Sequence, residues 1–423
     1  MKKYCFMAIL LLAGIAVSAQ GIDEISKYHL LGQNKKAKEV LDKFISEPKN
    51  AGKADAWYYK GRIYNAVSKD SGTSVTDAMK LKMDAFEAFK KYQQLDPKEL
   101  NLKNDQYVWY FDLYNGFFDI GAKEYNRKNY SGAFDGFKNA LVVEEYTRSK
   151  NYEYNGYRFP VMDTSLIQNT AMAAYQAKDT AAGVTYYRKI TDANVGGEAY
   201  MGIYQVLAEY YLKNKDEANM NAMLDKGRSL YPKEKYWTEV EVDAVSRTGK
   251  KEALYAKYEE LMKRYPDEYT WPYNLSVELF NELYAGDAKP ANALAMKAKL
   301  TEILKNAIAI QGEKGADARM LMTRHTFNDA YDYQDSSKKF KGMKPEDVKK
   351  RNDAKAFFIK KIDECIPYAE SVATFYSAQT TLKPVHKANL KIALDILSQL
   401  YTAKGDAKKA AEYDKKKADA EKL

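Results

Sequence analysis

Apolar residues recur along the chain at the three- and four-residue spacing of amphipathic helices, in pairs of segments separated by short turns. One stretch shows this most clearly, because its residues return in the same order 34 positions later. The first copy contains Tyr231, Pro232, Glu234 and Trp237, and the second contains Tyr265, Pro266, Glu268 and Trp271. A fixed period of this length is typical of stacked-repeat architectures, in which each helix pair packs against its neighbours.

A turn residue followed shortly by alanine marks the junction inside many of these pairs. The combinations are Asn34 with Ala37, Asn129 with Ala133, Asp179 with Ala182, Asn214 with Ala218, Gly249 with Ala253 and Asp406 with Ala410. Asn, Asp and Gly accept the backbone angles of a tight turn, and alanine lets the second helix approach the first closely. The sequence shows no sustained alternation, and we expect no strands and no Asn-Gly hairpin.

The helical pattern continues without a change of composition, so we predict a single domain over residues 20–423. Three segments interrupt the pattern and are predicted as insertions: 68–76, 286–292 and 336–350. The last segment, 407–422, carries charged residues on most faces, which suits a capping helix whose outer side meets water. The fold class predicted is all-α, a solenoid of about eight or nine degenerate helix pairs.

The repeat resembles the tetratricopeptide repeat. The fullest copy of that motif contains Trp57, Gly61, Tyr64, Ala85, Phe89 and Pro97, and the next contains Gly121, Ala133, Phe137 and Ala140. Lys60 departs from the usual Leu, and about a dozen extra residues separate Gly61 from Ala85. The resemblance implies a right-handed α-solenoid that binds a protein partner in the concave groove lined by the first helix of each pair.

The same resemblance implies contact residues on two first helices. Positions one and five after Trp57 carry over to Tyr58 and Arg62, and Asn65 follows by helical spacing. The corresponding positions of the next copy give the further candidates Phe118, Ala122 and Tyr125. The version of the family that binds a terminal carboxylate needs Lys, Asn and Arg at several such places, and Ala122 departs from it. The predicted partner-binding residues are therefore Tyr58, Arg62, Asn65, Phe118 and Tyr125.

The N-terminus reads as a cleavable signal peptide over residues 1–19. Lys2 and Lys3 precede an apolar stretch over 6–17, and Ala19 ends a small-residue cleavage site. An uncleaved anchor is the alternative, although the apolar stretch is shorter than the roughly 20 residues of a good span. Cys5 precedes the apolar stretch and is no acylation site, and Cys365 reads as a buried apolar residue. We expect an exported, periplasmic protein that does not span the membrane.

Charge adds one local feature to this picture. The formal net charge of +9 is mild for 423 residues, and together with export it argues against nucleic acid as a partner. A basic cluster lies in 338–351 and consists of Lys338, Lys339, Lys341, Lys344, Lys349, Lys350 and Arg351. It reads either as a contact for an anionic partner, such as a lipid headgroup, an acidic glycan or an acidic protein face, or as a solvated loop.

No residue pattern in the sequence indicates catalysis, a metal or a cofactor. The mature chain has three histidines, His29, His325 and His386, which lie in different repeats. His325 and Asp329 could share a helix face, but zinc needs three or four ligands, and we expect a surface or groove histidine. We therefore predict a non-enzymatic scaffold for protein partners. The alternatives are envelope glycan capture through aromatic residues, and an enzyme that depends on His325.

Overall fold

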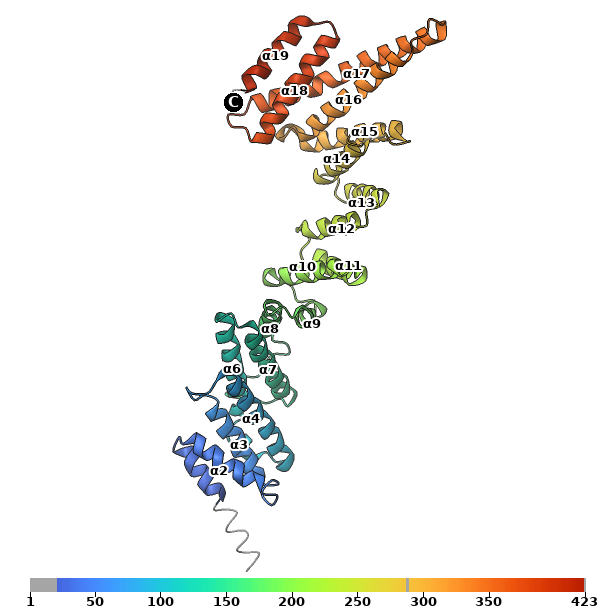
Figure 1. Cartoon of the computed structure of the whole chain (residues 1–423). Coiled ribbons are helices and arrows are strands. Elements are labelled where there is room, and N and C mark those ends of the chain that lie inside the picture. The colour runs from blue at the N-terminus through green and yellow to red at the C-terminus, as the bar shows by residue number, and fades with distance from the viewer. Residues whose placement is uncertain (1–20, 287–288, 422–423) are drawn as a thin grey trace, which may run out of the picture. The chain divides into compact units, whose positions relative to one another are not determined.

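The computed structural model describes residues 21–286 and 289–421 (Figure 1). The predicted signal peptide, 1–19, lies outside the described residues. The chain divides into two compact units, with the boundary after Trp237, and each unit is described by itself. The single domain predicted for 20–423 stays a prediction.

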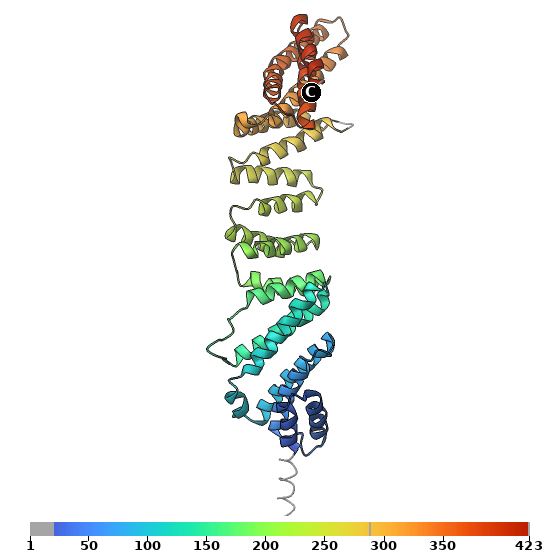
Figure 2. The same cartoon turned by 90° about the vertical axis from the view of Figure 1, so that its left-hand side faces the viewer.

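Unit 1 is a stack of helix pairs (Figures 1 and 2). It begins with a helix over 21–30 and continues with α2 (Asn34–Ser46), α3 (Ala54–Val67), α4 (Val75–Leu95), α5 (Leu100–Asn104), α6 (Val108–Asn126), α7 (Tyr130–Ser149), α8 (Thr164–Gln176), α9 (Thr180–Asp192), α10 (Glu198–Lys213) and α11 (Glu217–Leu230). The first two residues of α12 (Tyr236–Ser246) also belong to it.

Unit 2 contains the rest of α12 and longer helices toward its end. It comprises α13 (Lys251–Arg264), α14 (Thr270–Tyr284), α15 (Ala293–Gln311), the short 3₁₀ helix η1 (Gly312–Lys314), α16 (Asp317–Lys339), α17 (Pro345–Ser377), α18 (Pro384–Ala403) and α19 (Ala407–Glu421). Cys365 is fully buried in the core of this unit, which confirms its predicted role as an apolar residue.

The all-α fold is confirmed, since the described residues contain helices and no strand. With the short helices α5 and η1 set aside, the described helices make nine pairs, in line with the predicted number. Side-chain caps at the turns explain why the pairs bend where they do. Asp179 accepts a hydrogen bond from the backbone of Ala182 at 3.0 Å, and Asp216 accepts one from Asn219 at 3.1 Å. The residue before each of these caps, Lys178 or Lys215, has a positive φ.

Aromatic rings pack directly against the glycines of the repeat motif. A Cβ atom on Gly61 would lie 2.4 Å from the ring of Phe89, and one on Gly121 would lie 2.6 Å from Phe137. Each glycine belongs to the first helix of a pair and each ring to the second. The motif residues therefore set the distance between paired helices, because only glycine leaves room for the ring.

One expectation about turns is wrong. Asn155 and Gly156, both with positive φ, form a tight turn flanked by a bridge between Tyr154 and Tyr157, where we expected no Asn-Gly hairpin. The insertion 336–350 is mostly helical, because α16 continues to Lys339 and α17 begins at Pro345. Of the insertion predicted over 68–76, residues 68–74 lie outside the helices and the last two residues belong to α4, which begins at Val75.

Candidate functional site

The residues predicted as a binding row on α3 are largely buried between repeats. Tyr58 is 5% exposed, and its hydroxyl donates a hydrogen bond to Asp105, which precedes α6. Asn65 is 1% exposed, and its Nδ2 donates to Asp112 Oδ2 of α6 at 2.6 Å. The structure therefore uses both side chains to attach the α3–α4 pair to the next pair.

Arg62 lies between these two side chains and is only partly buried. Its guanidinium lies 4.8 Å from the ring centroid of Trp109 and 5.5 Å from that of Tyr58. Its Nη1 donates to the Tyr58 hydroxyl at 3.3 Å, while its Nε is buried without a hydrogen-bond partner. Arg62 is thus the member of the predicted α3 row whose hydrogen-bonding capacity is incompletely used.

Phe118 and Tyr125 lie on α6, half-buried, and their rings contact residues of α6 and α7. The ring of Phe118 lies 5.7 Å from that of Phe137, and the ring of Tyr125 lies 5.3 Å from that of Tyr130. The structure therefore brings Tyr58, Arg62 and Asn65 together and leaves these two in aromatic contacts of their own.

Lys82 of α4 completes the contact between these repeats, and sequence reasoning missed it. It is 3% exposed and donates to Asn65 Oδ1 at 3.0 Å. Burial lowers the pKa of this lysine to about 8. A Cβ on Gly116 of α6 would lie 2.3 Å from Lys82 Nζ, so the glycine makes room for the ammonium group. No local sequence signal joins residues so far apart along the chain.

Polar contacts link further first helices of unit 1 in the same manner. The Tyr114 hydroxyl of α6 donates to Asp163, the cap of α8, at 3.1 Å. Thr164 of α8 hydrogen-bonds the Tyr200 hydroxyl of α10 at 2.7 Å. Many polar groups on the face expected to bind a partner are therefore already engaged in hydrogen bonds between repeats.

Glu144 of α7 is a buried acid beside this series of contacts. It is 4% exposed, and its Oε2 has no hydrogen-bond partner. Burial, and after it the negative charge of Asp163, raises the pKa of Glu144 to about 7. Such a carboxyl group takes up a proton more readily than an exposed one.

The expectation that His325 lies on a surface or in a groove is wrong. It is 1% exposed, and its ring nitrogens hydrogen-bond the Tyr284 hydroxyl at 3.0 Å and Thr301 Oγ1 at 2.8 Å. Burial lowers the pKa of His325 to about 4, so the ring is neutral at neutral pH. Both nitrogens are already satisfied, so the ring packs as a core residue between α14, α15 and α16.

An ion network lies one helical turn beyond His325 and opens to solvent at a pocket of unit 2. Lys297 of α15 approaches Asp329 at 2.9 Å and Asp332 at 2.5 Å, and Lys361 of α17 approaches Asp329 at 3.2 Å. The α15–α16 pocket has a volume of about 260 Å³ and is lined by Lys289, Ala293, Leu294, Lys297, Asp329, Asp332, Tyr333 and Ser336.

The α15–α16 pocket joins paired charges to an unusually exposed apolar side chain. Leu294 is 77% exposed at the start of α15. Tyr333 on the other side stacks on Phe357 of α17 with ring centroids 5.4 Å apart, and Phe357 is 49% exposed. This arrangement offers an apolar anchor beside hydrogen-bonding groups of both charges, which suits the binding of another chain.

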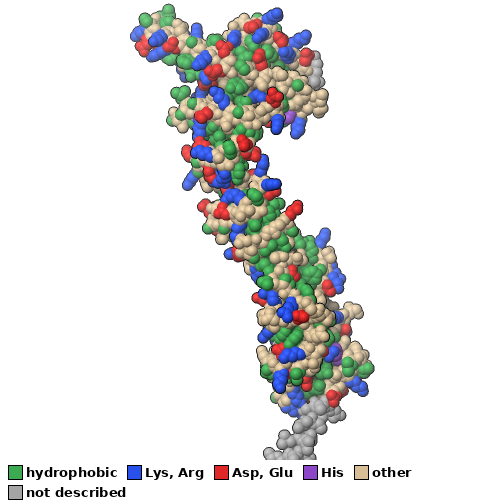
Figure 3. Space-filling view, turned by 180° about the vertical axis from the view of Figure 1, so that it is seen from behind, with side chains coloured by type: hydrophobic (Ala, Val, Ile, Leu, Met, Phe, Trp, Pro, Cys, Tyr) green, Lys and Arg blue, Asp and Glu red, His purple; other side chains and the backbone are tan. Residues whose placement is uncertain are grey.

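The described residues contain no group of three or more His, Cys, Asp and Glu side chains that could hold a metal ion. Within the same ranges no helix has the length and apolar character needed to cross a membrane. On the face seen in Figure 3, side chains of both charges are interspersed, as the sequence predicts for solvated helix surfaces.

No protein-family model matches the sequence, and no curated protein matches it. Among solved structures, the chain is similar to the P58(IPK) TPR domain, with 13% identity, coverage of 90% of this chain and 98% of that one, and a TM-score of 0.26. It is also similar to yeast Tom70, with 10% identity, coverage of 93% and 96%, and a TM-score of 0.22. A third is Naa15/Naa10 bound to HypK-THB, with 11% identity, coverage of 95% and 63%, and a TM-score of 0.27.

Similarity this low says nothing of what the chain binds. The architecture is shown by the chain's own helices and packing. The helices are paired, the tight sequence period is 34 residues, and Gly61 and Gly121 each receive a phenylalanine ring of the partner helix. The chain is built from tetratricopeptide-like helix pairs.

Proposed function

We propose that this protein is an exported, periplasmic scaffold that binds a segment of a partner protein. The observation that carries the proposal is the α15–α16 pocket, where Leu294 is exposed beside Lys289, Lys297 and Asp332. An exposed leucine next to a pocket with charged walls can be covered by an apolar side chain of the partner, while the walls hydrogen-bond its backbone.

The predicted row on α3 and α6 is a second proposed contact surface. Tyr58 and Asn65 are already engaged between repeats, so Arg62, stacked near Trp109, is the residue that would meet the partner there. Phe118 and Tyr125 are half-buried and would add aromatic surface. Since the α3 row also joins repeats, its variants test stability and binding together, and the α15–α16 pocket is the cleaner target.

Site-specific photo-crosslinking in intact cells tests the proposal. A crosslinker placed at Leu294 should give a discrete protein adduct, and Asp332→Lys should weaken that adduct because it removes the partner of Lys289 and Lys297. Leu100 of α5, 57% exposed and in unit 1, is the matched control position, because it does not line the α15–α16 pocket. Equal adducts at both positions, or none at Leu294, would count against the α15–α16 pocket as a binding site.

Glycan capture at the envelope is the second candidate, favoured by one observation. Tyr157, on the Asn155–Gly156 turn, is 53% exposed, with its ring edge-on to Phe159 at 5.6 Å. An exposed ring held by a second ring can stack on a sugar. Glycan-array binding that disappears in Tyr157→Ala, with crosslinking at Leu294 absent, would favour this function over the scaffold.

A further inference from the structure

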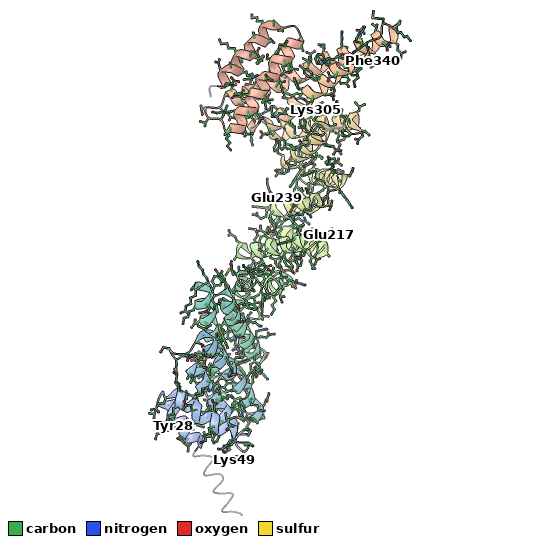
Figure 4. The ribbon with its side chains drawn as sticks, viewed as in Figure 1. Tyr28, Lys49, Glu217, Glu239, Lys305 and Phe340 are labelled. Atoms are coloured by element: carbon green, nitrogen blue, oxygen red, sulfur yellow. The ribbon has the colours of Figure 1, made fainter. Side chains whose placement is uncertain are left out.

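The helical hairpin formed by α16 and α17 ends in a short turn. The two helices extend beyond α18 and α19, and Phe340 lies at their far end (Figures 1 and 4). Residues 340–344 connect them. Arg351 of α17 reaches back to this turn, and its Nη1 donates to the carbonyl oxygens of Phe340 at 2.9 Å and Gly342 at 3.5 Å. We call residues 338–351 the hairpin tip.

Much of the positive charge at the hairpin tip is uncompensated. Lys338 pairs with Asp335 at 2.9 Å and Lys350 with Glu346 at 2.7 Å, while Arg351 is engaged with the turn. The remaining lysines have no carboxylate within ion-pair distance among the described residues, and all are exposed: Lys339, Lys341, Lys344 and Lys349. They come from the end of α16, the turn and the start of α17, so the charge is distributed over all three parts of the tip.

An apolar side chain occupies the turn between these lysines. Met343 is 85% exposed, the second-highest exposure among the large hydrophobic residues of the described chain. It follows Gly342 and precedes Lys344 in the turn that Arg351 holds. Transfer of the exposed methionine side chain from water into an apolar layer would be favourable in free energy.

We propose that the hairpin tip docks on an anionic lipid surface, with its unpaired lysines at the headgroups and Met343 inserted between them. Anionic headgroups attract clustered lysines, and an inserted apolar side chain adds to that attraction. An acidic protein groove would suit charge gathered on one face of a helix. Charge distributed around an apolar turn suits a flat surface that meets the whole end of the hairpin.

Vesicle co-sedimentation of the full mature chain tests this inference independently of the scaffold function. We expect binding to phosphatidylcholine vesicles that contain phosphatidylglycerol, little binding to pure phosphatidylcholine, and weaker binding as salt rises. The triple variant Lys339→Glu, Lys341→Glu, Lys344→Glu should reduce binding about tenfold or more. The matched control places the same three charge reversals at Lys305, Lys408 and Lys415, which are exposed elsewhere in unit 2.

A labelled cysteine reports the insertion step. Cys365 is fully buried, so Met343→Cys can be labelled selectively with an environment-sensitive dye. The emission should shift to the blue on anionic vesicles and stay unchanged on neutral ones. Equal loss of binding in the tip and control triples would overturn the proposal, as would an unshifted dye. Failure to bind anionic vesicles, with retention on an immobilised acidic protein, would assign the hairpin tip to a protein partner instead.

Discussion

Buried ionisable residues in this protein differ in whether their polar atoms have hydrogen-bond partners. Lys82 has Asn65 as a partner, and His325 has a partner at each ring nitrogen, whereas one carboxylate oxygen of Glu144 has none. A group whose pKa differs between the folded and unfolded states makes stability depend on pH. His325 and Glu144 are therefore predicted to change stability in opposite directions as pH falls.

His325 should make the protein less stable in acid. Its pKa is about 4 in the fold against 6.5 for a free histidine, so the unfolded chain binds the proton first as pH falls. Stability is then lost between pH 6.5 and 4, by up to about 3 kcal/mol from this residue. In thermal melts, the melting temperature of the wild type should exceed that of His325→Gln at pH 7, and this difference should narrow by pH 4. His386→Gln is the control, and a constant gap would contradict the prediction.

Glu144 should have the reverse effect. Its pKa is about 7 in the fold against 4.5 when free, so its protonated form favours folding below pH 4.5 and that benefit is lost as pH rises through 7. Glu144→Gln should therefore raise the melting temperature at pH 8, by the equivalent of roughly 1 to 3 kcal/mol, and change it little at pH 5. The exposed neighbour Glu145 provides the control Glu145→Gln. A lower melting temperature for Glu144→Gln at both pH values would show that the charged form is well solvated.

At the residue scale, the sequence predicted features set within one helix better than burial that depends on other helices. It placed Cys365 correctly because the apolar stripe around it is local. It misjudged His325, because Tyr284 and Thr301, which cover the ring, come from other helices. It also had no means of finding Lys82, whose space depends on Gly116 of a later helix. The proposed contacts Tyr58 and Asn65 came from motif position, which does not show how deeply a neighbouring repeat covers a side chain.

The helix pair is the element in which the repeat motif has its physical effect. In the α6–α7 pair, a Cβ on Gly136 would lie 2.6 Å from the backbone nitrogen of Gly121, and Phe137 fills the adjacent space. A backbone cannot move aside as the end of a flexible side chain can. The distance between paired helices is therefore most sensitive at such glycines.

Gly136→Ala should lower the free energy of unfolding by about 1–3 kcal/mol, because the added methyl group separates α6 from α7. Gly202→Ala is the matched control within α10, where an added Cβ meets no heavy atom within 4 Å. That change should be neutral or stabilise by about 0.5–1 kcal/mol, because alanine restricts the unfolded chain. Chemical denaturation of both variants measures the difference, and equal effects would refute the steric explanation.

Element boundaries followed from the sequence wherever an apolar stripe was present. The pairs from α10 to α13 match the region of 34-residue period. The extension of α16 and α17 was missed because its residues are lysine-rich and carry no stripe, although lysine is a good helix former. Pro345, which lies inside the predicted insertion 336–350, occupies the first position of α17, where proline is compatible with a helix.

At the scale of the whole molecule, stability should be distributed among neighbouring repeats. Each hydrophobic cluster draws on a short run of consecutive helices, as in the cluster of unit 2 built from α16 to α19. A stack of this kind behaves as a series of local contacts instead of one common core. The chain also divides into two compact units, which fits that description.

Destabilisation should therefore remain local. In hydrogen-exchange measurements, Gly136→Ala should speed exchange in α6, α7 and the adjoining α8, and leave α16 to α18 at wild-type rates. A uniform increase across both units would show that the chain unfolds as one cooperative body. The Gly202→Ala variant serves as the reference for unperturbed exchange.

The two glycine–phenylalanine contacts occur at very different separations along the chain. Gly61 and Phe89 are 28 residues apart, whereas Gly121 and Phe137 are 16 apart, yet both rings meet their glycine in the same manner. The extra length is taken up by segment 68–74 and by the part of α4 that precedes Phe89, which is longer than the part of α7 that precedes Phe137, without disturbing helix pairing. That segment is consequently a natural place to install an epitope or a fluorescent reporter, giving a tagged protein that keeps its native packing.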